Sequence, residues 1–167
     1  TTSLQGRGVS FAMCEAELVW EAILDDAVTG DLQPTYGKGQ RWKAALDSPV
    51  LVPPSARDLR RHVVPMLGIY PARGCPYRCN FCSVWQLYDR SFRERSIGAV
   101  VDDFASVGEH VFVADDLFWN HPQRSLELAE ALKKRGIRKR WVLVQTRTDV
   151  ACRRPDLLEA WRPIAKD

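Results

Sequence analysis

Short runs of hydrophobic residues alternate with helix-like spacings along the second half of the chain. The runs are bounded by proline, acidic or turn residues, and they predict three buried strands: Met66–Tyr70, Val111–Ala114 and Trp141–Val144. Between and after them, apolar residues recur every three or four positions and predict three helices: 97–107, 122–135 and 155–161. A strand and a helix thus alternate at a spacing of roughly 35 residues, which favours right-handed βαβ units and a parallel sheet.

The residues at the ends of these helices support the same boundaries. Ser96 is a side chain that can cap the first helix, and Gly108 is placed to close it. Pro122 can open the second helix, and a Lys-Lys-Arg run before Gly136 complements the dipole at its carboxyl end.

The first third of the chain has a weaker pattern. An apolar stripe predicts a helix that starts at Glu15 and ends at Gly30 in a left-handed turn. Residues 31–62 show no sustained period and contain several glycines and prolines, so we expect a connector there. It would separate residues 1–30 from a larger domain at 63–167.

Composition narrows the classes of protein. The chain has 167 residues, of which 46% are hydrophobic, enough for one sizeable core. A formal charge of +3 is too small to indicate nucleic acid as a partner. No apolar run approaches the roughly 20 residues of a transmembrane segment, and the N-terminus lacks a signal-peptide core, so we expect a cytoplasmic protein. Because the chain starts without Met and stops at Asp167, we expect a piece of a longer protein.

Three of the five cysteines fall within eight residues, directly after the first predicted strand. The stretch reads Cys75-Pro76-Tyr77-Arg78-Cys79-Asn80-Phe81-Cys82. Thiolates at this spacing can converge on one inorganic core, and an odd number of cysteines argues against a disulfide framework. Because electron-carrying clusters usually have four cysteine ligands, a local set of three predicts an iron with an open position. Cys14 is expected to be a small buried thiol.

The carboxyl ends of the other two strands also carry polar residues. Ligands of parallel α/β folds bind at these ends, so we expect one shared mouth there. Asp115 and Asp116 follow the second strand, and Arg147 and Asp149 follow the third. Two readings stay open for each pair, since the acids can bind a ligand or cap the next segment, and Arg147 can bind a ligand or pair with Asp149.

The motif Cys75-x3-Cys79-x2-Cys82, with an aromatic Phe81 before the last cysteine and a strand before the first, resembles that of the radical S-adenosylmethionine enzymes. The resemblance covers residues 63–167. It implies that the three cysteines bind three irons of a [4Fe-4S] cluster, and that the amino and carboxylate groups of S-adenosylmethionine chelate the fourth. It also implies reductive cleavage to methionine and a 5′-deoxyadenosyl radical, with a reductant such as a flavodoxin or ferredoxin.

The resemblance also implies roles for residues outside the cysteine motif. Many members hold the methionine amino group with a motif of small and acidic residues where Val113–Phe118 stands here, which makes Asp115 or Asp116 the candidate ligand. The usual Gly-Gly-Glu is absent. Arg147 is a candidate for the carboxylate or ribose, because a guanidinium is a fixed fork of donors. Phe81 would shield the cluster from solvent.

The loop at 71–82 is similar to the branch of the family that carries a cobalamin-binding domain upstream. Residues 9–30 resemble the last strand and helix of that domain, but the Asp-x-His-x-x-Gly cobalamin signature does not occur. Cobalamin is thus implied for the parent protein and has no location in this chain. The branch includes methyltransferases that act at unactivated carbons of small molecules or lipids, and the run 111–161 resembles hopanoid C-3 methylases.

The expected fold is therefore α/β: a partial parallel (β/α) barrel of the radical S-adenosylmethionine type, formed by the N-terminal half of the core domain. A short remnant of a cobalamin-binding Rossmann-like domain would precede it. Three βα units cannot close a barrel, so we expect little turnover from the chain alone.

A non-catalytic iron–sulfur module, for electron transfer or structure, is the alternative function. It would need Cys152 or Cys14 as a fourth ligand. A zinc site is disfavoured because the three histidines do not follow finger spacing.

Overall fold

The computed structural model describes residues 8–39, 46, 62–63 and 65–165, and the chain divides into two compact units after Ala45. The larger, C-terminal unit contains the cysteine motif. Most of the expected connector at 31–62 lies outside the described residues. In the described part of the chain, no helix is long and apolar enough to cross a membrane.

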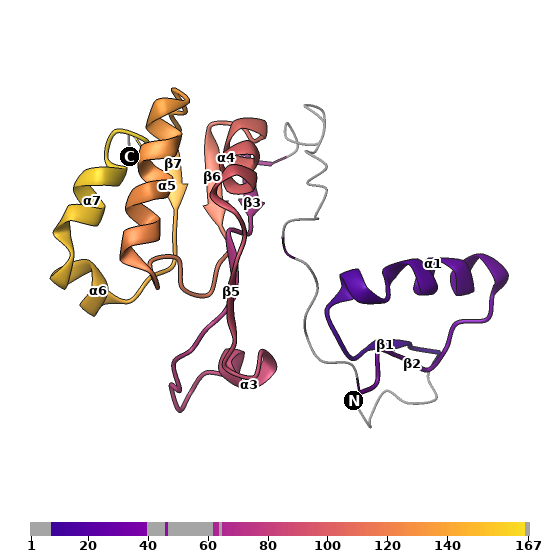
Figure 1. The fold of residues 1–167 in the computed structure, drawn as a ribbon. Helices are drawn as coiled ribbons and strands as arrows, with labels where there is room; N and C mark the ends of the chain where they lie inside the picture. Colours follow the sequence, from indigo (N-terminus) through magenta and orange to yellow (C-terminus); the bar gives the residue numbers. More distant parts are fainter. Residues whose placement is uncertain (1–7, 40–45, 47–61, 64, 166–167) are drawn as a thin grey trace. The chain divides into compact units, whose positions relative to one another are not determined.

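The centre of the C-terminal unit is a parallel sheet of three strands in the order β3-β6-β7 (Figure 1). The strands are β3 (Met66–Ile69), β6 (His110–Val113) and β7 (Trp141–Leu143). The register places Leu67, Val111 and Val142 side by side, so these residues share one face of the sheet. The predicted parallel sheet is confirmed.

Four helices follow the strands (Figure 1). They are α4 (Ile97–Ser106), α5 (Pro122–Lys134), α6 (Thr148–Arg153) and α7 (Pro155–Trp161). The predictions of α4, α5 and α7 are confirmed, whereas α6 was not predicted. α5 packs between α4 and α7.

At the ends of α4, the predicted N-cap at Ser96 is confirmed, and the predicted closure by Gly108 is wrong. The Ser96 hydroxyl accepts a hydrogen bond of 3.3 Å from the backbone N–H of Ala99, as an N-cap should. Gly108 does not close the helix in a left-handed turn, because the chain leaves α4 through Val107 in an extended conformation. The buried Lys139 instead donates from Nζ to the carbonyl oxygens of Val107 (2.7 Å) and Gly108 (3.0 Å).

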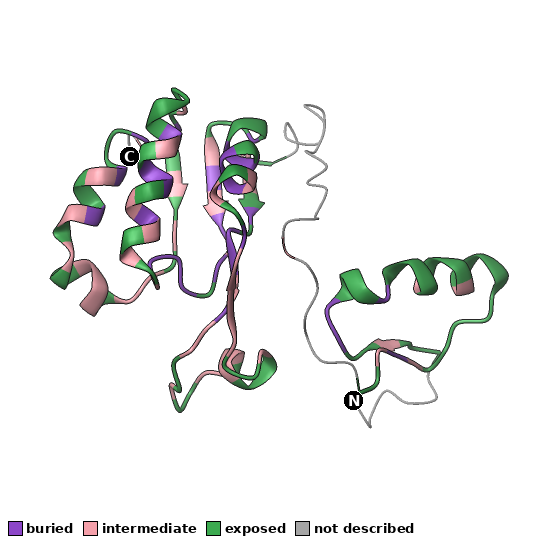
Figure 2. Cartoon of the chain, viewed as in Figure 1, coloured by how far each residue is buried: buried purple, intermediate pink, exposed green. Residues whose placement is uncertain are grey.

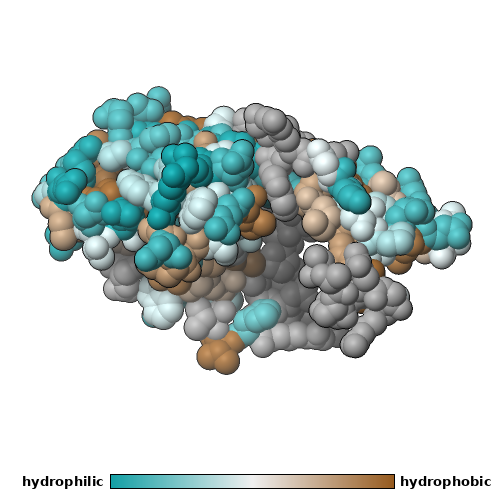
Figure 3. Space-filling view, turned by 90° about the horizontal axis from the view of Figure 1, so that it is seen from below, coloured by the Kyte–Doolittle hydropathy of each residue, from teal (hydrophilic) through white to brown (hydrophobic). Residues whose placement is uncertain are grey.

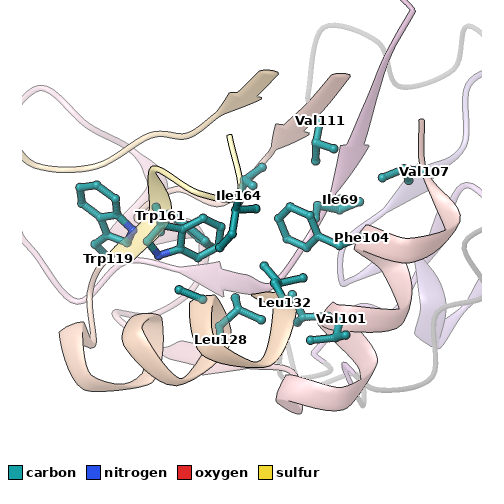
Figure 4. Packing of buried hydrophobic residues seen from close by; sticks show 14 of the residues in the cluster. Ile69, Val101, Phe104, Val107, Val111, Trp119, Leu128, Leu132, Trp161 and Ile164 are labelled. Carbon is teal, nitrogen blue, oxygen red and sulfur yellow. The ribbon is translucent and has the colours of Figure 1, made fainter. Parts of the chain in front are cut away.

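The hydrophobic core lies between the helices and one face of the sheet. Ile69, Val111, Phe104 and Leu132 have no solvent-exposed surface, and they meet where α4 and α5 cross the strands (Figure 4). Complete burial of one such aliphatic or aromatic side chain stabilises the fold by about 1.5–3 kcal/mol. Figure 2 shows buried residues on α4, α5, β3 and β6, whereas β7 has none.

The opposite face of the sheet is more open. Trp141 and Leu143 on β7 remain 42% and 53% exposed, and they line a surface hollow together with Met66. In the space-filling view, hydrophilic residues cover most of the visible surface of this unit and hydrophobic groups show between them (Figure 3).

A second, antiparallel pair of strands carries the cysteine motif. It consists of β4 (Ala72–Gly74) and β5 (Phe92–Glu94), with α3 (Val84–Leu87) in the connection (Figure 1). The expectation that the first predicted strand runs directly into the cysteine loop is wrong, because β4 intervenes. Gly74 makes the tight entry possible, since its φ is +91° and a Cβ there would lie 2.2 Å from the Ser91 carbonyl oxygen.

The N-terminal unit is a small parallel β-α-β arrangement. Its strands are β1 (Phe11–Ala12) and β2 (Thr35–Tyr36), and a 3₁₀ turn (η2, Ala16–Leu18) precedes the helix α1 (Trp20–Thr29). The helix begins five residues later than predicted and ends as predicted at Gly30, whose φ is +82°. Strand β2 was not predicted.

Cys14 lies in the small core of this unit. Its side chain is 5% exposed and packs with Val19 and Tyr36, which confirms that it is a buried thiol.

Candidate functional site

The cysteine motif occupies the connection between β4 and β5. Cys75, Cys79 and Cys82 are free thiols, and each is partly exposed. The Cys82 N–H donates to the Cys79 carbonyl over 3.1 Å, and the Trp85 Nε1–H donates to the same oxygen over 3.2 Å. The turn that separates the second and third cysteines is thus held by a neighbouring aromatic side chain.

The surroundings of Cys75 are electronegative. Partial burial raises the pKa of its thiol, and the charges of Asp116, Cys79 and Cys82 raise that pKa further. The other two cysteines of the motif and one acid from the end of β6 are therefore close enough to Cys75 to interact with it electrostatically.

The donor set suits an iron–sulfur cluster. Three thiols without disulfide partners, all reachable from solvent on one loop, are the soft ligands that such clusters take. The described residues contain no ready-made group of three or more His, Cys, Asp or Glu side chains that could hold a metal ion.

Asp115 and Asp116 both bind the backbone of β4. The Ala72 N–H donates to Oδ1 of Asp115 over 2.9 Å, and the Gly74 N–H donates to Oδ2 of Asp116 over 3.2 Å. Asp115 is 2% exposed, whereas Asp116 is exposed. Neither acid caps α5, whose N-cap residue is His121.

Burial raises the pKa of Asp115 to about 7. The Ala72 hydrogen bond and the charge of Arg124 oppose this rise, while the charges of Asp116 and Glu94 add to it. The second carboxyl oxygen, Oδ2, has no hydrogen-bond partner among the described residues.

Asp115 lines a small cavity of about 10 Å³ together with Glu94, His121 and Arg124. His121 Nδ1 lies 2.8 Å from Oε2 of Glu94, and Nε of Arg124 lies 3.1 Å from its Oε1. Glu94 thereby ties β5 to the start of α5. Sequence reasoning missed Glu94 and Arg124, because neither belongs to a motif or follows a strand of the main sheet.

Arg147 makes the pair with Asp149 that was one of the two possibilities left open by the sequence. Its Nε donates to Oδ1 of Asp149 over 2.8 Å, and its guanidinium carbon lies 4.2 Å from the centre of the Tyr77 ring. The hydrogen bond to Asp149 is the main reason that the pKa of Arg147 is raised, and Arg147 in turn lowers the pKa of Asp149. A cation–π contact thus joins the end of β7 to the cysteine loop. Sequence reasoning did not select Tyr77.

Two other sequence candidates lie apart from these contacts. Phe81 is 89% exposed, so its ring points into solvent in this structure. Cys152 is exposed on α6.

An exposed carboxylate after β6 and a guanidinium after β7 thus contact residues next to or within the cysteine motif. The β6 acids contact the root of the cysteine loop, and Arg147 from the end of β7 contacts Tyr77 within it. Carboxylate and guanidinium groups are suited to the ammonium and carboxylate of an amino-acid ligand, and the thiols to iron.

Comparison with known proteins identifies several relatives, although no family model matches. The chain is 35% identical over 121 residues to the hopanoid C-3 methylase of Methylococcus capsulatus, which covers 67% of this chain and 23% of that protein. It is 28% identical over 137 residues to the bacteriochlorophyllide d C-12(1)-methyltransferase of Chlorobaculum tepidum, covering 74% of this chain and 29% of that protein. An anaerobic magnesium-protoporphyrin IX monomethyl ester cyclase of Rubrivivax gelatinosus is 34% identical over 84 residues, 47% of this chain and 15% of that enzyme.

These relatives and the cysteine motif together define a class of enzymes. The chain belongs to the radical S-adenosylmethionine superfamily, and within it to the branch with cobalamin-binding domains that includes hopanoid C-3 methylases. It spans less than a third of the length of these methylating relatives.

Proposed function

We propose that this chain is part of a radical S-adenosylmethionine methyltransferase in which Cys75, Cys79 and Cys82 hold three irons of a [4Fe-4S] cluster. The observation that carries the proposal is that three free, partly exposed thiols lie on one loop, which begins at a strand hydrogen-bonded to the acids after β6. When bound, the cluster supplies the electron that cleaves S-adenosylmethionine to methionine and a 5′-deoxyadenosyl radical. No catalytic residue beyond the cluster ligands is proposed.

Asp115, Asp116 and Arg147 are the candidates for binding the cosubstrate, and Phe81 is the candidate for covering the cluster. Asp116 suits the methionine ammonium better than Asp115, because its carboxylate is exposed and close to Cys75, whereas Asp115 is buried. The guanidinium of Arg147 is proposed for the carboxylate or ribose, since it already lies against the cysteine loop. Phe81 would cover the cluster once the three cysteines have bound it.

The architecture is proposed as the first three βα units of a (β/α) barrel at residues 63–167. Residues 31–62 would link it to residues 1–30, the remnant of a cobalamin-binding Rossmann-like domain. The parallel pairing of β1 with β2 around α1 supports a Rossmann-like origin. The rest of the barrel would come from the longer parent protein, which would also hold the cobalamin.

The reaction is proposed to be cobalamin-dependent methyl transfer to an unactivated carbon of a small molecule or lipid. Two relatives are named as a methylase and a methyltransferase, and the hopanoid C-3 position is the candidate target. A flavodoxin or ferredoxin would supply the electron, and the protein would be cytoplasmic.

Anaerobic reconstitution of the chain with ferrous iron and sulfide tests the cluster assignment. We expect about four irons per chain in the parent and in the Cys152→Ser control, and loss of the cluster when Cys75, Cys79 or Cys82 is replaced by Ser. Loss of iron from Cys152→Ser would instead support the alternative, a four-cysteine module for electron transfer or structure.

Electron paramagnetic resonance of the reduced cluster separates the two functions further. An iron with an open position must change its spectrum when S-adenosylmethionine binds, so we expect new features on adding the cosubstrate. An identical spectrum with and without S-adenosylmethionine would contradict the proposed enzyme.

A further inference from the structure

Two backbone N–H groups of β4 point away from its partner strand, β5. The register pairs Ala72 with Glu94 and Arg73 with Arg93, and the Arg95 N–H donates to the Pro71 carbonyl over 2.9 Å. Hydrogen-bonded pairs alternate with non-bonded pairs in an antiparallel ladder. Ala72 and Gly74 are therefore non-bonded positions, and their N–H groups face the outer edge of β4.

Two consecutive side chains occupy that edge. Oδ1 of Asp115 accepts the Ala72 N–H over 2.9 Å, and Oδ2 of Asp116 accepts the Gly74 N–H over 3.2 Å. The next outward position is Pro76, which has no N–H to satisfy. The two carboxylates thus take both of the donors that an additional strand would bind here.

We propose that Asp115 and Asp116 are positioning residues that take the place of a neighbouring strand along β4 and hold the root of the cysteine loop at the carboxyl end of β6. The effect of these two residues on a cluster rests on the proposed function, whereas their contacts with β4 do not. Gly74 directly precedes Cys75, so fixing its amide also fixes the point from which the first thiol leaves the strand.

The other strand of the hairpin is held independently. Glu94 on β5 pairs with Arg124 of α5 and with His121 at its start, and Arg124 also donates to the Arg95 carbonyl. Hydrogen bonds therefore join β4 of the hairpin to the residues after β6, and ion pairs join β5 to the start of α5. This arrangement predicts that loss of either acid loosens β4 without unfolding the unit.

Amide hydrogen exchange of the full chain, followed residue by residue by NMR, tests the contacts directly. Asp115→Leu should speed exchange of the Ala72 amide, and Asp116→Ala that of the Gly74 amide, each by about tenfold or more, because the hydrogen-bond acceptor is lost. Asp115→Asn and Asp116→Asn should stay within a few-fold of the parent, since the amide oxygen still accepts. Asp102→Asn on the surface of α4 is the matched control.

Iron uptake tests whether the contact with Gly74 matters for the cluster. Asn keeps an oxygen that accepts the Gly74 N–H, so Asp116→Ala should bind less iron and Asp116→Asn should bind as much as the parent. Urea unfolding of the same variants checks that the fold is retained. Asp116→Ala should keep the fold, because the side chain that it removes is exposed.

Two results would overturn the inference. The first is unchanged exchange at Ala72 and Gly74 in Asp115→Leu and Asp116→Ala. The second is full iron uptake by Asp116→Ala despite faster exchange of the Gly74 amide. Absence of iron from the parent chain would count against the proposed function alone, because the exchange rates test the contacts without any cluster.

Discussion

Replacing Asp115 by Asn removes a carboxyl group that the folded chain keeps out of water. Burial raises the pKa of Asp115 from its ordinary value of 3.8 to about 7, against the effect of the Ala72 N–H that it accepts. The charged groups around it are Glu94 from β5, Arg124 from α5 and the adjacent Asp116, and His121 lines the same cavity. Asn keeps an acceptor for Ala72 and does not titrate.

The sign of the effect follows from proton binding. A carboxyl whose pKa is raised by folding binds its proton more tightly in the folded state than in the unfolded chain, so its ionisation disfavours the fold. The contribution of Asp115 to stability should therefore be largest below about pH 4, decrease as the pH rises, and level off above about pH 7. At about 1.4 kcal/mol per pH unit, this difference in pKa corresponds to about 4 kcal/mol.

Urea unfolding of parent and Asp115→Asn at pH 4 to 8 measures this difference. The buried Trp119 and Trp161 provide the fluorescence signal. The free energy of unfolding of the variant minus that of the parent should rise by about 4 kcal/mol between pH 4 and pH 8. Asp102→Asn, an exposed residue paired with Arg135, is the control and should change stability by less than about 1 kcal/mol. A difference that does not vary with pH would refute the reasoning.

Three further changes test the fold through the free energy of unfolding in urea. Leu132→Ala should cost about 2–5 kcal/mol because the side chain is fully buried, and an equal loss in the 54% exposed Leu158→Ala would contradict this. Ser96→Ala should cost about 1 kcal/mol by removing the cap of α4, and no loss would show that the cap is dispensable. Gly98→Ala should stabilise α4 by about 0.5–1 kcal/mol, because nothing lies close to the position of the added Cβ. Gly74→Ala should destabilise the protein, because the φ of Gly74 is +91°. Effects of the same sign at the two positions would contradict this difference in backbone conformation.

The regular part of the fold could be predicted because its sequence is locally consistent. Ile69, Val111 and Val113 lie in short apolar runs, and α4 and α5 carry apolar residues at helical spacing with a cap or proline at the start. Strand and helix alternation then leaves a parallel sheet as the simple solution.

The hairpin of β4 and β5 could not be predicted in this way. Each strand has only three residues, and Ala72–Gly74 contains no apolar alternation. Its outer hydrogen bonds come from Asp115 and Asp116, about 40 residues away along the chain, and no local pattern encodes such contacts. The end of α4 is similar, because Lys139, about 30 residues away along the chain, binds the carbonyl groups of Val107 and Gly108 directly after the helix.

For the candidate site, the rule that ligands bind at strand ends selected residues that lie close to the cysteine motif in the structure. Asp116 and Arg147 were selected as strand-end residues, and the structure places them against Gly74 and Tyr77 of the cysteine segment. What each acid binds could not be predicted, because the outward N–H groups exist only once β4 has formed.

The order β3-β6-β7 has a consequence for how the chain is made. Each strand of this sheet pairs with the strand that precedes it in synthesis, so no strand must wait for a later one to be inserted between existing neighbours. Ribosomes add about 5–20 residues per second, so N-terminal segments are free to fold before C-terminal ones have been made. The sheet can therefore grow strand by strand during translation, and emergence of Asp115 and Asp116 behind β6 would fasten the hairpin before β7 and α7 have been synthesised.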